Sequence, residues 1–262
     1  PDQLDLPYDR ARPAVASHRG ETLALSLDAD LHRKLLDLAQ HSKASLFMVL
    51  QAGVSALLTR LGAGTDIPLG SSIAGRTDDA LDELVGFFVN TLVLRADTSG
   101  NPSFRELVAR VREVDLEAYA HQDLPFERLV EILNPQRSMA RHPLFQVSLA
   151  LHNHNKSAFD LPDLSVAFEE TTLKVARFDL LLSFLEKRDA DGTAQGLSGM
   201  IEYASDLFDQ QTVERIAAQL TRLLTAVADN AEQPIGSIDL LSAQERHQIL
   251  HDWNDTAREV DP

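Results

Sequence analysis

Cysteine is absent from this chain of 262 residues, and long hydrophobic runs are absent as well. Without cysteine there can be no disulfide, no thiolate nucleophile and no cysteine-ligated metal site. No run approaches the roughly 18 apolar residues of a membrane helix, and the opening segment PDQLDLPYDRARP lacks the apolar core of a signal peptide. These absences predict a soluble, cytoplasmic protein with no membrane partner.

Basic residues are in the minority, because 24 Lys and Arg face 40 Asp and Glu and leave a net charge of −16. Such a chain repels nucleic acids and anionic membranes, and no basic patch with interleaved aromatic residues offsets the repulsion. Nucleic acid is therefore excluded as a predicted partner. The 44% of hydrophobic residues can build the core of one large domain or of two modest ones.

Strand and helix patterns follow one another without regular alternation. Alternating or apolar segments predict strands at residues 21–27, 66–76, 91–97, 144–152, 164–170, 178–187 and 196–205. Capping residues and 3.6-residue periodicity predict helices at residues 29–41, 45–62 and 104–118, from Pro125, from Asp209 and, in a short piece, from Ser242. This mixture predicts an α+β fold in which helices cover a mixed sheet.

Familiar catalytic and metal-binding signatures are missing from the sequence. There is no G-x-S-x-G elbow and no P-loop. His247 and His251 have the spacing of a zinc pair but lack the glutamate of H-E-x-x-H, so a solvated helix face is the favoured interpretation. His152 and His154 share one side of a strand end without an evident third ligand. The sequence predicts no metal site.

The segment AYAHQDLPFERLVEIL places His121 two residues before Asp123 at the entrance of a helix. The pair could be a general base and its orienting carboxylate, but Asp123 is equally suited to be the helix N-cap, and the spacing favours this structural role. Asn90 follows a hydrophobic run and either ties a loop or reaches into a cleft. Arg137 and Arg141 are expected to pair with carboxylates or to lie at the surface.

Three segments occur in a fixed order along the chain: LVGFFVNTLVLR, HQDLPFE and RSMARHPLFQV. They resemble the three later core motifs of the condensation domains of nonribosomal peptide synthetases. DIPLGSSIAGR, ARFDLLLSF and GMIEYASDLFD fit the same family, and LLSAQERHQILHDWNDT resembles the linker towards an adenylation domain. The family-motif residues with expected structural roles are Gly86, Phe88, Asn90, Thr91, His121, Gln122, Asp123, Pro125, Arg137, Arg141 and Pro143.

Two departures from the family pattern stand out. Ser138, Ala140 and His142 replace the Asp, Ser and Asn that are usual in the last motif. The catalytic signature H-H-x-x-x-D-G is absent, and no two histidines are adjacent. A complete domain of this family is a V-shaped pair of lobes that each resemble chloramphenicol acetyltransferase. The resemblance therefore implies the carboxy-terminal lobe at residues 21–235, a connection from a missing amino-terminal lobe at 1–20, and the linker at 236–262.

The resemblance implies amide-bond formation between two thioester substrates carried by donor and acceptor peptidyl carrier proteins. Their phosphopantetheine arms arrive with the carriers, so no directly bound cofactor is expected. The implied partners are the missing amino-terminal lobe, both carriers and the adenylation domain downstream. This chain alone is expected to lack a catalytic residue and to be inactive. Ser71, Ser72 and Asn90 are expected at the substrate channel.

A latch onto the other lobe is implied for the segment that contains Gly199, Glu202, Tyr203 and Asp206. Proton transfer by His121 becomes the disfavoured role, with Asp123 expected to cap the helix. Two alternatives remain open: a non-catalytic interaction module or excised fragment, and a lobe of an epimerization or heterocyclization relative. Half a domain should also expose an apolar face that drives self-association.

Overall fold

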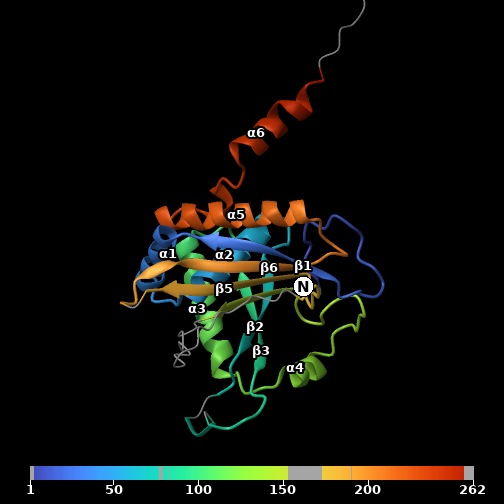
Figure 1. The fold of residues 1–262 in the computed structure, drawn as a ribbon, viewed down its shortest axis with the longest axis vertical. Helices are drawn as coiled ribbons and strands as arrows, with labels where there is room; N and C mark the ends of the chain where they lie inside the picture. The colour runs from blue at the N-terminus through green and yellow to red at the C-terminus, as the bar shows by residue number, and fades with distance from the viewer. Residues whose placement is uncertain (1–2, 77–78, 82, 153–172, 190, 257–262) are drawn as a thin grey trace, which may run out of the picture.

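The chain folds around one mixed β-sheet. A computed structural model describes residues 3–76, 79–81, 83–152, 173–189 and 191–256. In this part of the chain six strands pair in the order β1-β6-β5-β4-β2-β3 (Figure 1). The strands are β1 Gly20–Leu27, β2 Asp66–Ile73, β3 Asn90–Asp97, β4 Val147–His152, β5 Leu180–Arg188 and β6 Ala194–Ala204. β4 runs parallel to β2 and β5, whereas the β1–β6, β2–β3 and β5–β6 pairs are antiparallel.

The helices begin largely where the sequence places capping residues. They are α1 Ala29–His41, α2 Leu46–Arg60, α3 Phe104–Ala120, α4 Phe126–Leu133, α5 Gln210–Asp229 and α6 Ala243–Leu250, with 3₁₀ turns at Asp79–Leu81, Ile235–Ser237 and Asp252–Asn254. At the start of α3 the Ser103 hydroxyl accepts the Glu106 N–H at 3.2 Å, and the Glu106 carboxylate accepts the Ser103 N–H at 2.8 Å. This capping box fixes the predicted start of the helix.

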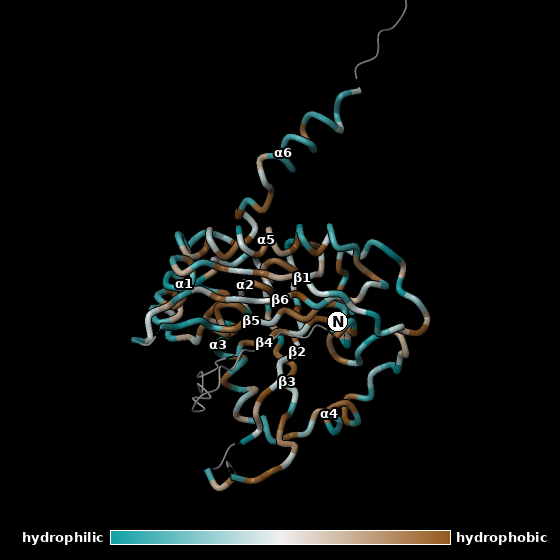
Figure 2. The backbone as a smooth tube through the Cα atoms, in the orientation of Figure 1, coloured by the Kyte–Doolittle hydropathy of each residue, from teal (hydrophilic) through white to brown (hydrophobic). Residues whose placement is uncertain are grey.

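Helices α1, α2, α3 and α5 pack on one face of the sheet. Their buried faces and every second strand residue form a single hydrophobic core. The central strand residues in this core are Leu69, Val147, Leu149, Leu182, Phe184 and Ile201. In Figure 2 the hydrophobic residues gather along the central strands, whereas hydrophilic residues dominate α6. The alternate strand residues point to the other face, which these four helices do not cover; this face is called the open face, and the candidate site lies on it.

The amino-terminal segment packs against the same core instead of standing apart from it. Leu4 is fully buried, and its N–H donates to the side-chain carbonyl of buried Gln146 at 3.0 Å. Asp9 accepts the Asp209 N–H at 2.7 Å and the Thr212 hydroxyl at 2.8 Å. The first turn of α5 is therefore held by a carboxylate 200 residues earlier in the chain. The assignment of residues 1–20 as a connection between lobes stays a prediction.

The carboxy-terminal segment leaves the body of the molecule, and α6 extends away from α5 (Figure 1). The Arg222 guanidinium holds its base by donating to the Leu240 carbonyl at 2.7 Å and by pairing with Glu245 at 3.0 Å. Among the described helices, none is by itself long and apolar enough to cross a membrane. α1 and α2 meet the length and composition together, but a bend of 103° separates them.

The α+β prediction is confirmed, and most element boundaries agree with the expected ones. Helix α2 stops as predicted just before Gly62, which has a φ of +96°, a conformation that glycine adopts without strain. The strand predicted at residues 164–170 lies outside the described residues, as does His154.

Candidate functional site

A cavity of about 1070 Å³ lies on the open face of the sheet. Its floor consists of side chains that alternate with the core residues, and its rim consists of two loops that precede β3 and α4. The predicted site residues that line it are Ser72, Phe88, Asn90, Thr91, Gln122, Asp123, Pro125 and Glu202. These residues come from four of the quoted segments, so four segments meet around one cavity. Two of the four are joined because β2 and β3 form a hairpin that pairs Ser72 with Thr91.

The Asn90 side chain ties two of these motifs together. Its amide Nδ2 donates to the carbonyls of Gln122 and Leu124 at 2.8 and 2.9 Å, and its Oδ1 accepts the Phe126 N–H at 3.1 Å. Oδ1 also accepts the Thr91 N–H at 2.9 Å. Both ends of the amide are thus engaged with backbone groups. Of the two roles open for Asn90, tying a loop is the one that these bonds demonstrate.

Asp123 is not the N-cap of α4, so that prediction is wrong. The N-cap position is occupied by Pro125 and receives no capping bond from a side chain of its own segment. Asp123 is exposed, and the free N–H of Phe126 is instead satisfied by Asn90 from the neighbouring loop. The tertiary fold supplies the cap because a proline at this position fixes the chain direction but offers no acceptor side chain.

The loop before β3 packs against the two residues Gly75 and Arg76, which follow the end of β2. Gly75 has a φ of +65°, and a Cβ at this position would lie 1.8 Å from the Phe88 carbonyl oxygen. The adjacent Arg76 donates to the Leu81 carbonyl and, at 2.9 Å, to the Leu84 carbonyl. Its guanidinium also lies 4.2 Å from the centre of the Phe88 ring. Only glycine allows this close approach, which explains the G-R pair in DIPLGSSIAGR.

An aromatic cluster lies beside the cavity, and two of its members, Phe126 and Phe178, line it. The His142 ring lies 4.1 Å from Phe145 and 5.2 Å from both Phe126 and Phe178, measured between ring centres. Burial among these rings lowers the pKa of His142 to about 4, so the imidazole is neutral at physiological pH. Phe145 also covers Gly70, where a Cβ would lie 2.0 Å from its ring.

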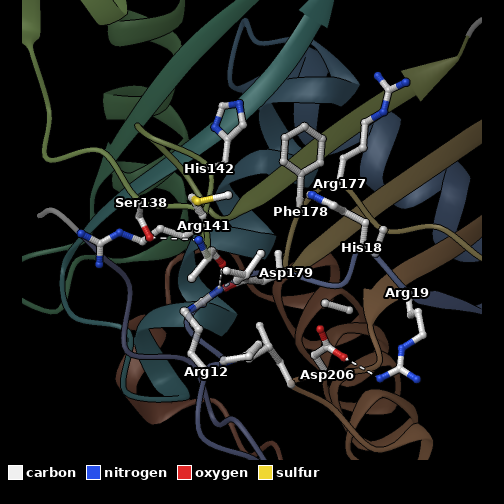
Figure 3. A pocket seen from close by; sticks show the side chains of 18 of the residues that line it. Arg12, His18, Arg19, Ser138, Arg141, His142, Arg177, Phe178, Asp179 and Asp206 are labelled. Atoms are coloured by element: carbon white, nitrogen blue, oxygen red, sulfur yellow. Dashed lines mark hydrogen bonds and ion pairs between the residues drawn. The ribbon is translucent and has the colours of Figure 1, made fainter.

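A second, smaller cavity of about 400 Å³ adjoins the first and shares Arg177 and Phe178 with it. At its base Arg12 pairs with the buried Asp179, and the Tyr8 hydroxyl donates to the same carboxylate at 2.8 Å. Figure 3 shows Arg12 and Asp179 together and the Arg19–Asp206 pair at the other side. Burial and the Asp179 charge raise the pKa of Tyr8. The network anchors the amino-terminal segment to the start of β5.

The segment predicted as a latch is β6, an inner strand of the sheet. Gly199 and Tyr203 pair with β1 on one side and with β5 on the other, so the backbone of β6 has no free edge to offer to another lobe. Asp206 accepts the Ser17 N–H at 3.0 Å and pairs with Arg19 at 3.3 Å. Glu202 points to the open face and lines the larger cavity. The latch stays a prediction, and it would have to act through side chains.

The other predicted residues lie further from the cavity. Ser71 is buried at 6% exposure and is not part of the cavity lining, because it alternates with Ser72 on β2. His121 is exposed and ends α3 without lining either cavity. Arg137 is exposed, and Arg141 donates to the Gln3 side chain at 2.7 Å beside the smaller cavity. In the described part of the chain, no group of three or more His, Asp or Glu residues could hold a metal ion.

The family comparison agrees with the motifs that meet at this site. The family model described as "Condensation domain" matches residues 1–250. The chain belongs to the condensation domain family. It is 52% identical over 260 residues to the dimodular nonribosomal peptide synthase of Bacillus subtilis (strain 168), a match that covers 99% of this chain and 11% of that protein. Malpibaldin synthetase of Mortierella alpina is 41% identical, over 98% of this chain and 4% of its own length.

Solved structures show the same fold. The X-domain from teicoplanin biosynthesis superposes with a TM-score of 0.86 at 38% identity, over 92% of this chain and 54% of that chain. A four-domain nonribosomal peptide synthetase bound to AMP and glycine superposes with a TM-score of 0.80 at 23% identity, over 94% of this chain and 19% of that one. The chain thus spans about half of a solved X-domain and a small part of the synthetases.

Sequence reasoning missed several residues that build this condensation-domain site. Phe126, Phe145 and Phe178 each lie inside a quoted motif, but hydrophobic periodicity gives no sign that they converge. Arg177 lines both cavities. The signal that could have found these residues is their position inside the quoted motifs HQDLPFE, RSMARHPLFQV and ARFDLLLSF.

Proposed function

We propose that this chain is the carboxy-terminal lobe of a condensation domain that joins two carrier-bound aminoacyl or peptidyl thioesters through an amide bond. The observation that carries the proposal is the cavity on the sheet face that no described helix covers, which is lined by residues of two of the three core motifs, LVGFFVNTLVLR and HQDLPFE. Two facts support the assignment to one lobe. The chain covers about half of the X-domain structure, and H-H-x-x-x-D-G is absent from its sequence.

The open face suits one wall of a substrate channel. Its floor carries small or hydroxyl side chains, including Ser72, Ser148 and Ser183, which leave room for an extended substrate. Thioester aminolysis requires that the amine and the thioester be aligned and that the tetrahedral oxyanion be stabilised. We assign the alignment to this lobe and the catalytic histidine to the amino-terminal lobe that the family resemblance implies. Asn90 and Ser72 contribute to the channel wall, with Asn90 acting through the loop that it holds.

Donor and acceptor substrates would reach the channel on phosphopantetheine arms that belong to peptidyl carrier proteins. The cavity opens on the sheet face that none of the described helices α1, α2, α3 and α5 covers, and we infer that an arm enters from this side without displacing the core. The adenylation domain would follow the segment that contains α6, which extends from the body towards the carboxy terminus (Figure 1). This chain supplies neither the arm nor the activated thioester in the proposed reaction.

Reconstitution tests the proposal directly. This chain is mixed with the separately purified amino-terminal lobe of its parent domain, a donor aminoacyl carrier protein and an acceptor aminoacyl carrier protein. Amide product, detected by mass spectrometry of the carrier-bound species, is expected only when both lobes are present. Replacing the second histidine of H-H-x-x-x-D-G in the added lobe by alanine is the control and should abolish the product. Failure to form product with stably associated lobes would refute the proposed activity.

A non-catalytic interaction module is the second candidate. The X-domain from teicoplanin biosynthesis, 37% identical to this chain, has been solved in a complex with OxyB. A domain of this family can therefore present a binding surface to a separate protein. The same reconstitution separates the two functions, because an interaction module would associate with a partner yet give no amide. An epimerization or heterocyclization relative would instead give a substrate of inverted stereochemistry or a heterocyclic product.

A further inference from the structure

The larger cavity is acidic, whereas the smaller one beside it is basic. Among the described residues, Asp123, Glu127 and Glu202 face Arg177 in the lining of the larger cavity. Around the smaller cavity, four arginines face two aspartates, and Arg177 belongs to both linings. Two adjoining cavities with opposite charge do not suit one and the same group. The acidic cavity favours a cationic or N–H-rich ligand.

Among the three carboxylates that line the acidic cavity, Glu202 differs in its environment. Asp123 and Glu127 are exposed at the rim of the cavity. Asp123 lies in the turn before α4, and Glu127 lies in the first turn of that helix. Glu202 is half-buried and lies on β6, which is hydrogen-bonded along both edges. A carboxylate on an inner strand is held in place more firmly than one on a loop. Partial burial also strengthens its attraction to a cation, because the local dielectric constant is lower than in water.

The Glu202 carboxylate keeps acceptor capacity on the cavity side. The backbone N–H and the charge of Arg177 both lie near enough to favour its ionised form. A carboxylate has about four acceptor positions on its two oxygens, so the approach of this single backbone N–H leaves most of them available to a ligand. Burial nevertheless raises the pKa of Glu202, and the Arg177 N–H and charge oppose that shift only in part. A further donor from a ligand would complete the environment of the ionised form.

We propose that Glu202 is the positioning residue that binds the α-amino group of the acceptor substrate. The proposal rests on the proposed amide-forming function and names the group that holds its nucleophile. An α-amine has a pKa near 8 and reaches the channel largely as an ammonium ion. The Glu202 carboxylate accepts N–H bonds from this ammonium ion at the floor of the acidic cavity and orients the nitrogen towards the opposite lobe. One ammonium proton must pass to the histidine assigned to that lobe before the nitrogen lone pair can attack the thioester. The residue predicted as part of a latch is thus reassigned to substrate binding.

Ligand binding to this chain tests the inference without any turnover. The probes are aminoacyl-pantetheine amides, in which a stable amide replaces the thioester, and their desamino acyl counterparts, measured by calorimetry with a panel of side chains. We expect the best aminoacyl probe to bind about tenfold more tightly than its desamino counterpart, the usual value of a hydrogen bond to a charged group. Equal affinities, or no binding of any probe at millimolar concentration, would overturn the proposal.

Variants and pH identify the group responsible. Glu202→Gln should reduce the amine preference to less than twofold, and Glu202→Asp should restore part of it. Glu214→Gln is the matched control, since Glu214 is exposed on α5 beyond the opposite face of the sheet. If Glu202→Gln unfolds, pH titration of the unmodified chain replaces it: the preference should disappear as pH falls through the raised pKa of Glu202. A preference that survives in Glu202→Gln, or at a pH where Glu202 is protonated, contradicts the assignment.

The reconstituted enzyme separates this inference from the proposed function. There, Glu202→Gln should raise the KM for the acceptor carrier at least fivefold while changing the KM for the donor less than twofold. If reconstitution yields no amide at all but the amine preference persists, the proposed reaction fails and the amine site stands. If amide forms and Glu202→Gln leaves the acceptor KM unchanged, the reaction stands and the amine site fails.

Discussion

At the scale of single residues, Asn90 shows how one side chain can join two motifs that are far apart in the sequence. Its side chain forms hydrogen bonds with three backbone groups at the start of α4 and in the turn before it, and with one backbone group of its own strand. Asp123, which lies in that turn, contributes no cap to the helix. The stability of the cavity rim is therefore expected to depend on the asparagine and not on the aspartate, although both belong to family motifs.

Replacing Asn90 with alanine should lower the free energy of unfolding by about 2 kcal/mol, because several backbone donors and acceptors lose their partner at once and each net hydrogen bond contributes roughly 0.5–1.5 kcal/mol. Asp123→Ala should change it by less than about 0.5 kcal/mol, as is usual for exposed positions. Urea denaturation followed by circular dichroism measures both. Equal losses for the two variants would contradict the structural assignment of the cap.

Asp115 is a second residue whose effect is measurable, since it is fully buried on α3 where that helix packs against α2. Gln51 Nε2 donates to its Oδ1 at 2.9 Å, while no described group bonds to its Oδ2 or to the Gln51 Oε1. Burial raises the pKa of Asp115 to about 6, against an ordinary value of 3.8. Relative to the unfolded chain, the fold thus favours the protonated acid, which carries no charge to desolvate.

The sign of the pH dependence follows from this shift. A raised folded-state pKa stabilises the protein fully below pH 4, and the contribution is lost as pH rises through about 6. The loss between pH 4 and pH 8 should be on the order of 3 kcal/mol. Asp115→Asn, which offers an acceptor and a donor without a charge, should flatten the profile and be the more stable protein at pH 8. Thermal melts at fixed ionic strength from pH 4 to 8 check this, and an unchanged slope would refute it.

At the scale of elements, helix α5 begins where the sequence predicts but for a different reason. Asp209 occupies the N-cap position without a capping bond from its own side chain. Asp9, in the amino-terminal segment, accepts from the Asp209 N–H and the Thr212 hydroxyl instead. The negative charge also lies at the helix end where the peptide dipoles favour it. The amino-terminal segment therefore stabilises an element near the other end of the chain.

Asp9→Ala should cost about 1 kcal/mol of unfolding free energy, within the range of a lost N-cap. Asp209→Ala removes a pairing with Arg10 that is exposed to solvent, and exposed pairs contribute little. The ratio of the two losses, measured by guanidinium denaturation under identical conditions, is the test. Greater destabilisation by Asp209→Ala than by Asp9→Ala would show that the local residue is the functional cap.

At the scale of the whole molecule, one side of the chain exposes apolar residues that a closed protein would bury. Val85 and Phe87 protrude from the loop before β3 at 105% and 89% exposure. Ile132 and Leu133 are more than half exposed on α4, which contains no buried residue. Exposed apolar side chains of this size are typical of a surface that another protein part covers. Of these four residues, Phe87 also lines the acidic cavity, where the proposed second lobe would close.

The chain alone should therefore self-associate at high concentration. Sedimentation velocity from micromolar to several hundred micromolar concentration should show a rising weight-average sedimentation coefficient. The double variant Ile132→Glu, Leu133→Glu should remain monomeric over more of this range, because charged side chains oppose apolar association. Glu131→Gln on the same helix is the control, because it changes a side chain of α4 without placing a new charge on the apolar surface. A strict monomer for the unmodified chain at the highest concentration would contradict the expectation.

Prediction from the sequence succeeded where the signal is local. Capping residues and periodicity located α1, α2, α3 and α5, and the order of the motifs identified the family. It failed for the helix cap at Asp123 and gave no sign that Glu202 lies on a cavity floor, since both depend on partners distant in the sequence. It also gave no account of Arg177 and Phe178, which line both cavities; the smaller cavity exists only where four chain segments meet.

The amino-acid sequence by itself determines which elements form and to which family the chain belongs, because capping, alternation and motif identity act over a few residues. The tertiary structure decides which of those residues work together. Asn90 becomes a cap, Asp9 reaches a helix 200 residues away, and Glu202 turns from a latch candidate into the floor of an acidic cavity. The physical reason is that hydrogen bonds, burial and pKa shifts at these positions depend on neighbours that only chain folding brings within reach.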